Sequence, residues 1–227
     1  MNSYIIKNRK GRIYIMSRTI AKIIFSFVSI LLISNSSFSD TPKVSIRVLD
    51  EYEAGSRAAN RGNHKFALIF FKQCAKKGNP RCYFGLGSYH YFGDGGVKKN
   101  YPIAFKLMQK GAKGHYGPAE FLLGIMYRRG HGIRKDTHKS MEWVERAAYK
   151  CIPQAQADMG RFFMSVKKPG VNELMNSIAW LKLASSNGHK TAAKQASDMM
   201  REMPPQGVKE TNRIYTLLAK RQKCQNF

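Results

Sequence analysis

One spacing recurs along the chain and limits its fold more than any other feature. Four similar segments begin at positions 82, 119, 155 and 192, so that successive starts lie 37, 36 and 37 residues apart. A period of this length is typical of helical solenoids, in which helix pairs stack on one another. The segments are CYFGLGSYHYFGDGGV, AEFLLGIMYRRGHGI, AQADMGRFFMS and AAKQASDMMRE. We therefore expect an all-α solenoid of helix-turn-helix repeats.

A second set of segments lies between the first. Each begins with a small residue, has a large apolar residue three positions later and a pair of small residues at positions seven and eight. The spacing i, i+3, i+7 predicts helices, and small residues on the same stripe allow two helices to approach closely. The segments begin at Ala67, Ala104, Ser140 and Ser177, and their large residues are Phe70, Leu107, Trp143 and Trp180.

The turns between these helices also have a sequence basis. Gly78 and Gly188 can adopt the left-handed conformation that ends a helix. Asn79 followed by Pro80 predicts an N-cap and a first-turn proline for the next helix, and Asp136 predicts another N-cap.

These residues resemble the Sel-1-like repeat, a relative of the tetratricopeptide repeat. The match is clearest in AEFLLGIMYRRGHGIRKD from Ala119 and SMEWVERAA from Ser140. His115 and Cys151 stand where the family has a glycine between helices. The resemblance covers residues 63–203, which we expect to form four units, the last of them degenerate because terminal repeats act as caps. We expect a leading helix at 44–61 and a capping helix and tail at 204–227.

The amino-terminal sequence predicts a signal peptide over residues 1–39. Six basic residues and no acidic one precede the apolar run IIFSFVSILLIS, which is too short to span a membrane as a helix. Cleavage is expected after Ser39, and the chain starts at either Met1 or Met16. An uncleaved anchor is the alternative. We expect the mature protein to be exported, either periplasmic or secreted.

The mature chain is strongly basic. Without residues 1–39 it has 33 lysines and arginines against 14 acidic residues, a net charge of +19. For an exported protein the expected anions are acidic proteins, cell-wall polymers or lipid headgroups rather than nucleic acid. A basic, solvated surface with no particular partner is the alternative.

The four cysteines are expected to pair, because exported proteins meet oxidising conditions. Cys74 and Cys82 would face each other across the first helical hairpin, and cysteine-rich secreted relatives of the Sel-1-like type have a bridge of this spacing. A redox pair or a zinc site is the alternative there. Cys151 either pairs with Cys224, which would hold the carboxyl-terminal tail on the solenoid, or both are free thiols.

Other chemical sites have little support in the sequence. The six histidines show no helical metal-binding spacing, so we expect no metal and no cofactor. Ser165 and Lys168 match S-x-x-K, and some cysteine-rich relatives have been described as weak β-lactam-binding or β-lactam-hydrolysing proteins. That motif needs a neighbouring strand with K-T-G, whereas the chain has only Lys190-Thr191-Ala192. We therefore expect no catalytic residue.

The remaining candidate site is the concave face, which the first helix of each pair is expected to line. A protein or peptide, most readily an acidic one, would bind there by charge and by helix-in-groove packing. The alternatives are binding or hydrolysis of peptidoglycan or β-lactams, and attachment to anionic membrane surfaces. The candidate lining residues are Lys72, Gln73, Lys106, Gln109, Lys110, Glu142, Arg146 and Lys182.

Overall fold

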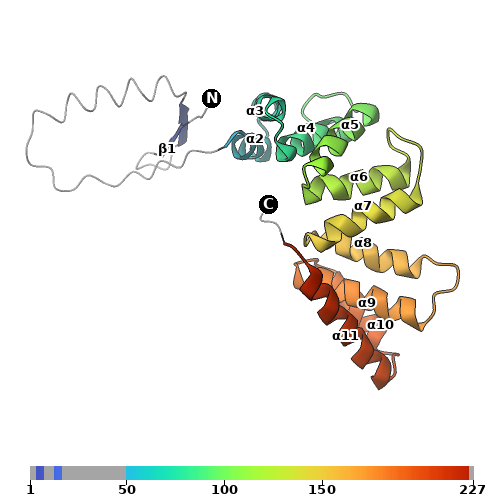
Figure 1. The fold of residues 1–227 in the computed structure, drawn as a ribbon. Helices are drawn as coiled ribbons and strands as arrows, with labels where there is room; N and C mark the ends of the chain where they lie inside the picture. Colours follow the sequence, from blue (N-terminus) through green and yellow to red (C-terminus); the bar gives the residue numbers. More distant parts are fainter. Residues whose placement is uncertain (1–3, 8–12, 17–49, 225–227) are drawn as a thin grey trace, which may run out of the picture. The chain divides into compact units, whose positions relative to one another are not determined.

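The computed structural model describes residues 4–7, 13–16 and 50–224, and within these the main element is the α-helix (Figure 1). The chain divides into two compact units, Met1–Cys74 and Ala75–Phe227. The all-α prediction is confirmed for the repeat region, whose helices follow one another without an intervening strand among the described residues. The apolar run of the predicted signal peptide and its cleavage point at Ser39 lie outside the described residues.

The first unit contains a short β-hairpin and helix α2. Strands β1 (Tyr4–Lys7) and β2 (Ile13–Met16) pair antiparallel, with Ile5 opposite Ile15. The sequence reasoning placed these residues in the basic part of the signal peptide and predicted no strands there. The segments YIIK and IYIM do not alternate apolar and polar residues, and apolar runs of four residues are too short to identify a strand.

Helix α2 (Glu51–Asn60) begins where Asp50 caps it, with Asp50 Oδ1 accepting from the Glu53 amide at 2.7 Å. Helix α3 (His64–Lys76) follows. Gly55 of α2 lies against the Phe71 ring so closely that an added Cβ would come within 2.6 Å of it. Of the leading helix predicted at 44–61, residues 44–49 lie outside the described residues, and the described part is α2, which begins after the capping Asp50.

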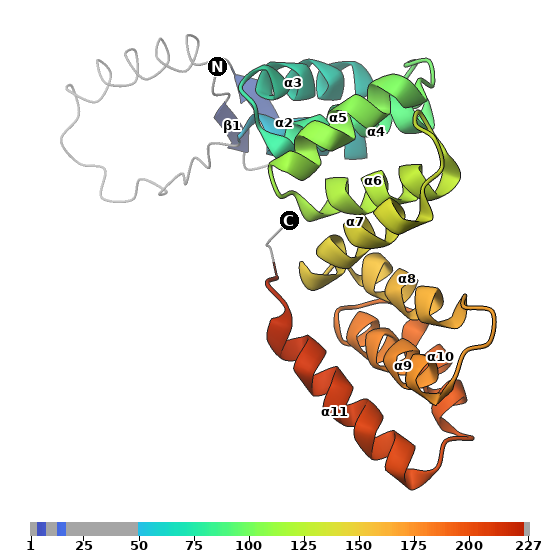
Figure 2. The same ribbon diagram turned by 45° about the vertical axis from the view of Figure 1, so that its right-hand side comes forward.

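The second unit is a stack of helices α4 to α11 (Figures 1 and 2). The second helices α6 and α8 each pack against both the preceding and the following first helix. The bounds are α4 Pro80–Phe92, α5 Tyr101–Lys113, α6 Gly117–Arg129, α7 Thr137–Tyr149, α8 Pro153–Met164, α9 Val171–Ser186, α10 Ala192–Met200 and α11 Pro205–Arg221.

Small residues bring these helices together, as their spacing predicted. Ala104, Ala119 and Ala147 are completely buried. An added Cβ on Gly124 would lie 2.7 Å from the Val144 side chain, so α6 and α7 are in contact along their backbones. Packing at this density makes the repeat sensitive to the volume of single side chains.

The turns show the repeat most directly. Gly78, His115, Cys151 and Gly188 occupy the same place in successive helix pairs, and all four have a positive φ, of 81°, 58°, 65° and 96°. The family pattern has glycine here because a Cβ is strained in this conformation. His115 and Cys151 therefore adopt a left-handed backbone conformation that normally favours glycine.

The N-caps predicted from the sequence are confirmed. Asn79 Oδ1 accepts from the Arg81 amide at 3.0 Å, and Pro80 occupies the first turn of α4. Asp136 Oδ1 accepts from the Lys139 amide at 3.0 Å at the start of α7.

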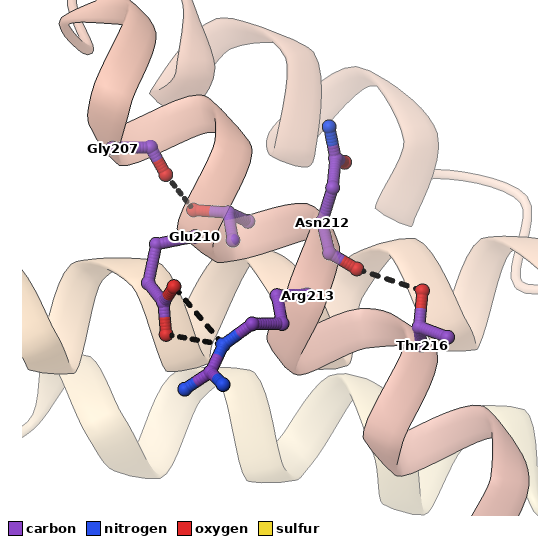
Figure 3. A network of polar contacts seen from close by, with 6 residues as sticks. Gly207, Glu210, Asn212, Arg213 and Thr216 are labelled. Atoms are coloured by element: carbon purple, nitrogen blue, oxygen red, sulfur yellow. Dashed lines mark hydrogen bonds and ion pairs between the residues drawn. The ribbon is translucent and has the colours of Figure 1, made fainter.

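Helix α11 closes the stack by lying along α9 (Figure 2). Leu218 packs in a cluster with Ala148 and Trp180. The other side of α11 carries polar contacts within the helix: Arg213 Nε donates to both carboxylate oxygens of Glu210 at 3.0 and 3.1 Å (Figure 3). This face of α11 is therefore held by local pairs and faces away from the core.

Candidate functional site

The residues predicted to line the concave face are mostly accessible. Lys106, Lys110, Glu142 and Arg146 are exposed on α5 and α7, and Gln109 is half-buried. Lys72 and Gln73 are exposed on α3, in the first unit. Their joint action with the residues of the second unit stays a prediction.

Lys182 is half-buried, because α11 packs along α9. Its Nζ hydrogen-bonds to Asn212 Oδ1 and lies 5.2 Å from the centre of the Tyr215 ring. The sequence did not show this, since the direction in which the capping helix returns depends on tertiary packing. Arg146 is half exposed and stacks on Trp143, with 4.6 Å between the guanidinium carbon and the ring centre.

The structure places a basic pocket at the carboxyl end of α7, where the chain leaving α11 crosses the helix ends. Its volume is about 550 Å³. Five lysine and arginine side chains border it, together with a histidine, a tyrosine and a glutamine. The lining residues are His115, Arg146, Tyr149, Lys150, Lys220, Arg221, Gln222 and Lys223. We refer to this set as the basic pocket.

A buried carboxylate lies beneath the pocket and fixes two of its cations. Glu120 is 0% exposed, and its Oε1 accepts from Lys150 Nζ at 2.6 Å and lies 3.8 Å from Arg146 Nε. Lys150 Nζ also donates to the backbone oxygen of His115 at 2.8 Å. A buried charge needs such partners, since an isolated carboxylate in the interior is strongly unfavourable.

The outer wall of the pocket is the end of α11 together with the segment that follows it. A disulfide joins Cys151 to Cys224, with 5.0 Å between their Cα atoms. The Lys223 amide donates to the Tyr149 backbone oxygen at 2.7 Å. The guanidinium of Arg221 lies 4.7 Å from the centre of the Tyr149 ring. The tail is therefore held on the α7–α8 turn by covalent, hydrogen-bond and cation–π contacts.

Gln222 reaches into the polar layer between helices. Its Oε1 accepts from Gln156 Nε2 at 3.0 Å and from Asn187 Nδ2 at 2.7 Å. Gln156 is completely buried and also donates to the Ala148 backbone oxygen at 2.9 Å. A single side-chain oxygen from the tail thus satisfies two donors of the solenoid.

Not all of the positive charge at the pocket is neutralised by ion pairs. Lys220, Arg221 and Lys223 form no ion pair with a carboxylate among the described residues. Burial raises the pKa of the Tyr149 phenol, and the nearby Arg221 opposes this rise while Glu145 adds to it. Tyr149 is therefore neutral near pH 7 and offers a ring face and a hydroxyl beside three available cations.

Sequence reasoning found one member of this pocket, Arg146. It did not find Lys150, Tyr149 or the three cations of the tail. One signal was available: a basic cluster, Lys220-Arg221 followed by Lys223, directly precedes the cysteine that was considered as a tether. Together with a Cys151–Cys224 disulfide, this basic cluster would have been predicted to lie at the α7–α8 turn.

The other cysteines and the serine motif have simple surroundings. Cys74 and Cys82 are disulfide-bonded. The Ser165 hydroxyl caps α8 by donating to the Phe162 backbone oxygen at 2.8 Å. Ser165 borders a cavity of about 570 Å³, and neither Lys168 nor Thr191 is among the described residues lining it. The geometry brings together none of the partners that the S-x-x-K motif needs.

The histidines are separated as well. His131 stacks on Tyr101 with 4.1 Å between ring centres, and its Nδ1 is 3.2 Å from the Tyr91 hydroxyl. No group of three or more potential metal ligands occurs in the described part of the chain. In that same part, no helix combines the length and the apolar character that crossing a membrane requires.

Comparison with known proteins relates this fold to a named repeat. The Sel1 repeat family model matches residues 80–116, 117–150 and 153–189. Each match contains the second helix of one pair and the first helix of the following pair. The three matches therefore cover α4–α5, α6–α7 and α8–α9. The degenerate unit around α10 lies outside them.

Two curated relatives match over part of their length. Protein sel-1 homolog 2 of Mus musculus is 36% identical over 135 residues, which is 55% of this chain and 19% of that protein. The ERAD-associated E3 ubiquitin-protein ligase component HRD3B of Arabidopsis thaliana is 24% identical over 138 residues, 60% of this chain and 21% of that protein. The chain thus spans about a fifth of the length of these relatives.

Among solved structures, a Sel1 repeat protein from Oxalobacter formigenes superposes with a TM-score of 0.60 at 28% identity, covering 76% of this chain and 70% of that one. This likeness agrees with the period, the small packing positions and the left-handed turn residues described above. The chain therefore contains three Sel1 repeats between residues 80 and 189 and is a Sel1-repeat protein with an α-solenoid fold.

Proposed function

We propose that this chain is an exported scaffold that binds an acidic partner protein. Sel1-repeat proteins are generally protein–protein interaction scaffolds, and one relative carries the description of a ligase component. The basic pocket is the observation that carries the proposal for this chain. Its three available cations and the Tyr149 ring form a surface for carboxylates attached to a polypeptide.

Three features of the pocket favour a protein over a single small anion. The buried Glu120 carboxylate already pairs with Lys150 and lies near Arg146, so a further carboxylate binds at the rim. The rim cations lie on a segment that is held to the solenoid by a disulfide, which limits the conformational entropy lost on binding. The aliphatic parts of the lysine and arginine side chains add apolar contact area.

Export is supported by two independent features. The amino-terminal segment has the basic and apolar order of a signal peptide. The Cys151–Cys224 disulfide is of the kind that persists in oxidising compartments.

The test is crosslinked pull-down from the envelope fraction of the source cells. The bait is the mature chain, compared with a variant in which Lys220, Arg221 and Lys223 are changed to glutamate. In a matched control, three lysines that are exposed and outside the pocket are likewise changed to glutamate: Lys167, Lys168 and Lys194. We expect acidic proteins on the wild-type and control baits, and at least about tenfold less on the pocket variant.

Equal recovery on the three baits would contradict the proposal. Variants Lys106→Glu and Lys110→Glu, combined, test the concave face separately because neither residue lines the pocket. Anionic vesicles as an alternative bait distinguish a membrane surface: retention on vesicles together with no protein partner would also contradict the proposal.

A further inference from the structure

Three residues near the ends of second helices occupy the same position in the repeat and have different surroundings. They are Tyr91 of α4, Arg128 of α6 and Met164 of α8, since their segments start at positions 82, 119 and 155. Tyr91 is buried in a hydrophobic cluster. Arg128 Nη1 lies 3.0 Å from Oδ2 of Asp158, which is 2% exposed. Met164 instead borders a cavity of about 570 Å³.

The residue on the following second helix changes in the same order. Leu122 packs in the cluster of Tyr91 and is 7% exposed, and Asp158 pairs with Arg128. The third equivalent is Gln195 of α10, which is exposed. The last unit has therefore lost both members of the pair, and a cavity lies between α8, α9 and α10. We refer to it as the terminal cavity; its lining includes Arg161, Met164, Ser177, Leu181, Gln195 and Met199.

A buried hydroxyl group borders the terminal cavity. Ser177 is 1% exposed, and its Oγ has no hydrogen-bond partner among the described residues. Ser140 has the same place and burial one repeat earlier, so the hydroxyl belongs to the repeat, and the open space beside it is specific to the last unit. A buried polar atom without a partner is unfavourable. A ligand with a polar atom at this depth would remove that cost.

The apolar walls of the terminal cavity suit an aromatic ring. Met164, Leu181 and Met199 form them. Methionine side chains adapt to irregular shapes, and their sulfur atoms make favourable contacts with aromatic rings. Tyr91, at the position equivalent to Met164, shows that this place in the repeat accommodates an aromatic side chain.

The charges around the terminal cavity disfavour a cation. Arg128 depends on the buried carboxylate of Asp158, whereas the equivalent Gln195 is neutral. Asp198 also borders the cavity, and it already pairs with Arg201 at 3.3 Å. Arg161 lines the cavity and adds positive charge. A guanidinium ligand would therefore meet a like charge and no unpaired carboxylate. A phenol is neutral, has the required ring and offers a hydroxyl group to Ser177.

We propose that the terminal cavity binds a tyrosine side chain of a partner polypeptide, with the ring between the two methionines and the phenol hydroxyl hydrogen-bonded to Ser177. The rim residues Arg161, Ser165 and Gln195 are exposed, which leaves the main chain of the partner accessible on both sides. The cavity volume lies in the usual range of ligand sites, about 300–1,000 Å³. The terminal cavity shares no residue with the basic pocket, so this inference does not depend on the proposed function.

Nuclear magnetic resonance of the mature chain with ¹³C-labelled methionine methyl groups tests the site. The probe is a capped pentapeptide, glycine-serine-tyrosine-serine-glycine, and three further peptides have phenylalanine, leucine or arginine at the centre. We expect the methyl signals of Met164 and Met199 to shift on titration, because a bound ring changes their local magnetic field. The signal of Met141, which is exposed on α7, should not move. The tyrosine peptide should bind about threefold or more tightly than the phenylalanine peptide, since one hydrogen bond distinguishes them.

Two variants separate the hydroxyl contact from the cavity itself. Ser177→Ala should remove the preference for tyrosine over phenylalanine while the phenylalanine peptide still binds. Met164→Arg combined with Gln195→Asp reproduces the pair of Arg128 and Asp158, and should abolish the peptide-induced shift of Met199. Thermal unfolding confirms that each variant is folded. Changing Lys220, Arg221 and Lys223 to glutamine should leave the titration unchanged, which separates this site from the basic pocket.

The inference is wrong if the tyrosine and phenylalanine peptides bind the wild-type chain equally, or if the arginine peptide binds more tightly. Peptide-induced shifts that persist at Met199 in the folded double variant would also contradict it. N-acetyltyrosinamide distinguishes a polypeptide from a free phenolic molecule: affinity equal to that of the tyrosine peptide would overturn the assignment to a partner chain, and weaker binding supports it.

Discussion

The amide of Lys223 donates to the backbone oxygen of Tyr149 at 2.7 Å, which fixes the carboxyl-terminal segment against the last residue of α7. This contact places the cations of the last turn of α11 and of Lys223 beside Lys150, where they form the wall of the basic pocket. The site is thus assembled from two parts of the chain that are about two repeats apart in sequence.

The disulfide between Cys151 and Cys224 should contribute substantially to stability, because it closes a segment of 73 residues. Chain-entropy arguments give about 2–4 kcal/mol for a bridge of this kind. Changing both cysteines to serine should lower the urea midpoint accordingly and increase amide exchange at Lys223. If the midpoint stays unchanged while Lys223 remains protected, the hydrogen bonds of Gln222 hold the tail without the bridge.

The pair Glu120 and Lys150 should behave asymmetrically on mutation. Lys150→Met leaves a carboxylate that is 0% exposed with only Arg146 near it, at 3.8 Å, and should cost about 3 kcal/mol. Glu120→Gln keeps an acceptor for Lys150 and should cost less. Urea unfolding of both variants and of the double variant measures the coupling. Additive effects in the double variant would contradict a direct interaction.

The left-handed turn position predicts opposite effects for two substitutions. His115→Gly removes a Cβ from a backbone with φ of 58°, and the relief of strain should at least offset the added freedom of the unfolded chain. Gly188→Ala introduces a Cβ at φ 96° and should destabilise by about 1 kcal/mol or more. Thermal unfolding compares the two. A loss of stability in His115→Gly as large as that in Gly188→Ala would show that the His115 side chain matters more than its backbone.

The histidine on the Tyr101 ring predicts a pH effect. Burial lowers the pKa of His131, and Arg129 and Lys99 lower it further. The unfolded chain then binds the proton more readily, so this histidine reduces stability as the pH falls through the ordinary histidine range near 6.5. His131→Gln should flatten the dependence of stability on pH between 7 and 5. Parallel pH profiles for wild type and His131→Gln would contradict this assignment.

The sequence predicted those parts of the fold that depend on local chemistry. Asn79 and Asp136 cap their helices because short polar side chains reach the free amides of the first turn. The glycine position at 115 and 151 kept its conformation despite the change of residue, since the stacked helices on both sides determine the path of the turn. These features follow from neighbouring residues or from the repeat itself.

The site could not be predicted in the same way. Lys182 was expected to line the concave face, and it also contacts Asn212 and Tyr215 of α11, a contact that only the tertiary structure shows. Glu120 is an acidic residue that is completely buried, and the periodicity of apolar residues does not indicate such a position. Its partner Lys150 comes from the next helix, 30 residues away, and long-range pairs of this kind leave little trace in one sequence.

The central claim is that the basic pocket binds acidic polypeptide. The most direct measurement is titration of the mature chain with a fluorescent octaglutamate peptide, followed by anisotropy at low and at physiological salt. The account predicts saturable binding that weakens with salt, and a loss of about tenfold or more in affinity when Lys220, Arg221 and Lys223 become glutamine. The matched change of Lys167, Lys168 and Lys194 to glutamine should have little effect. Equal losses in the two variants would contradict the claim, because binding would then follow net charge alone.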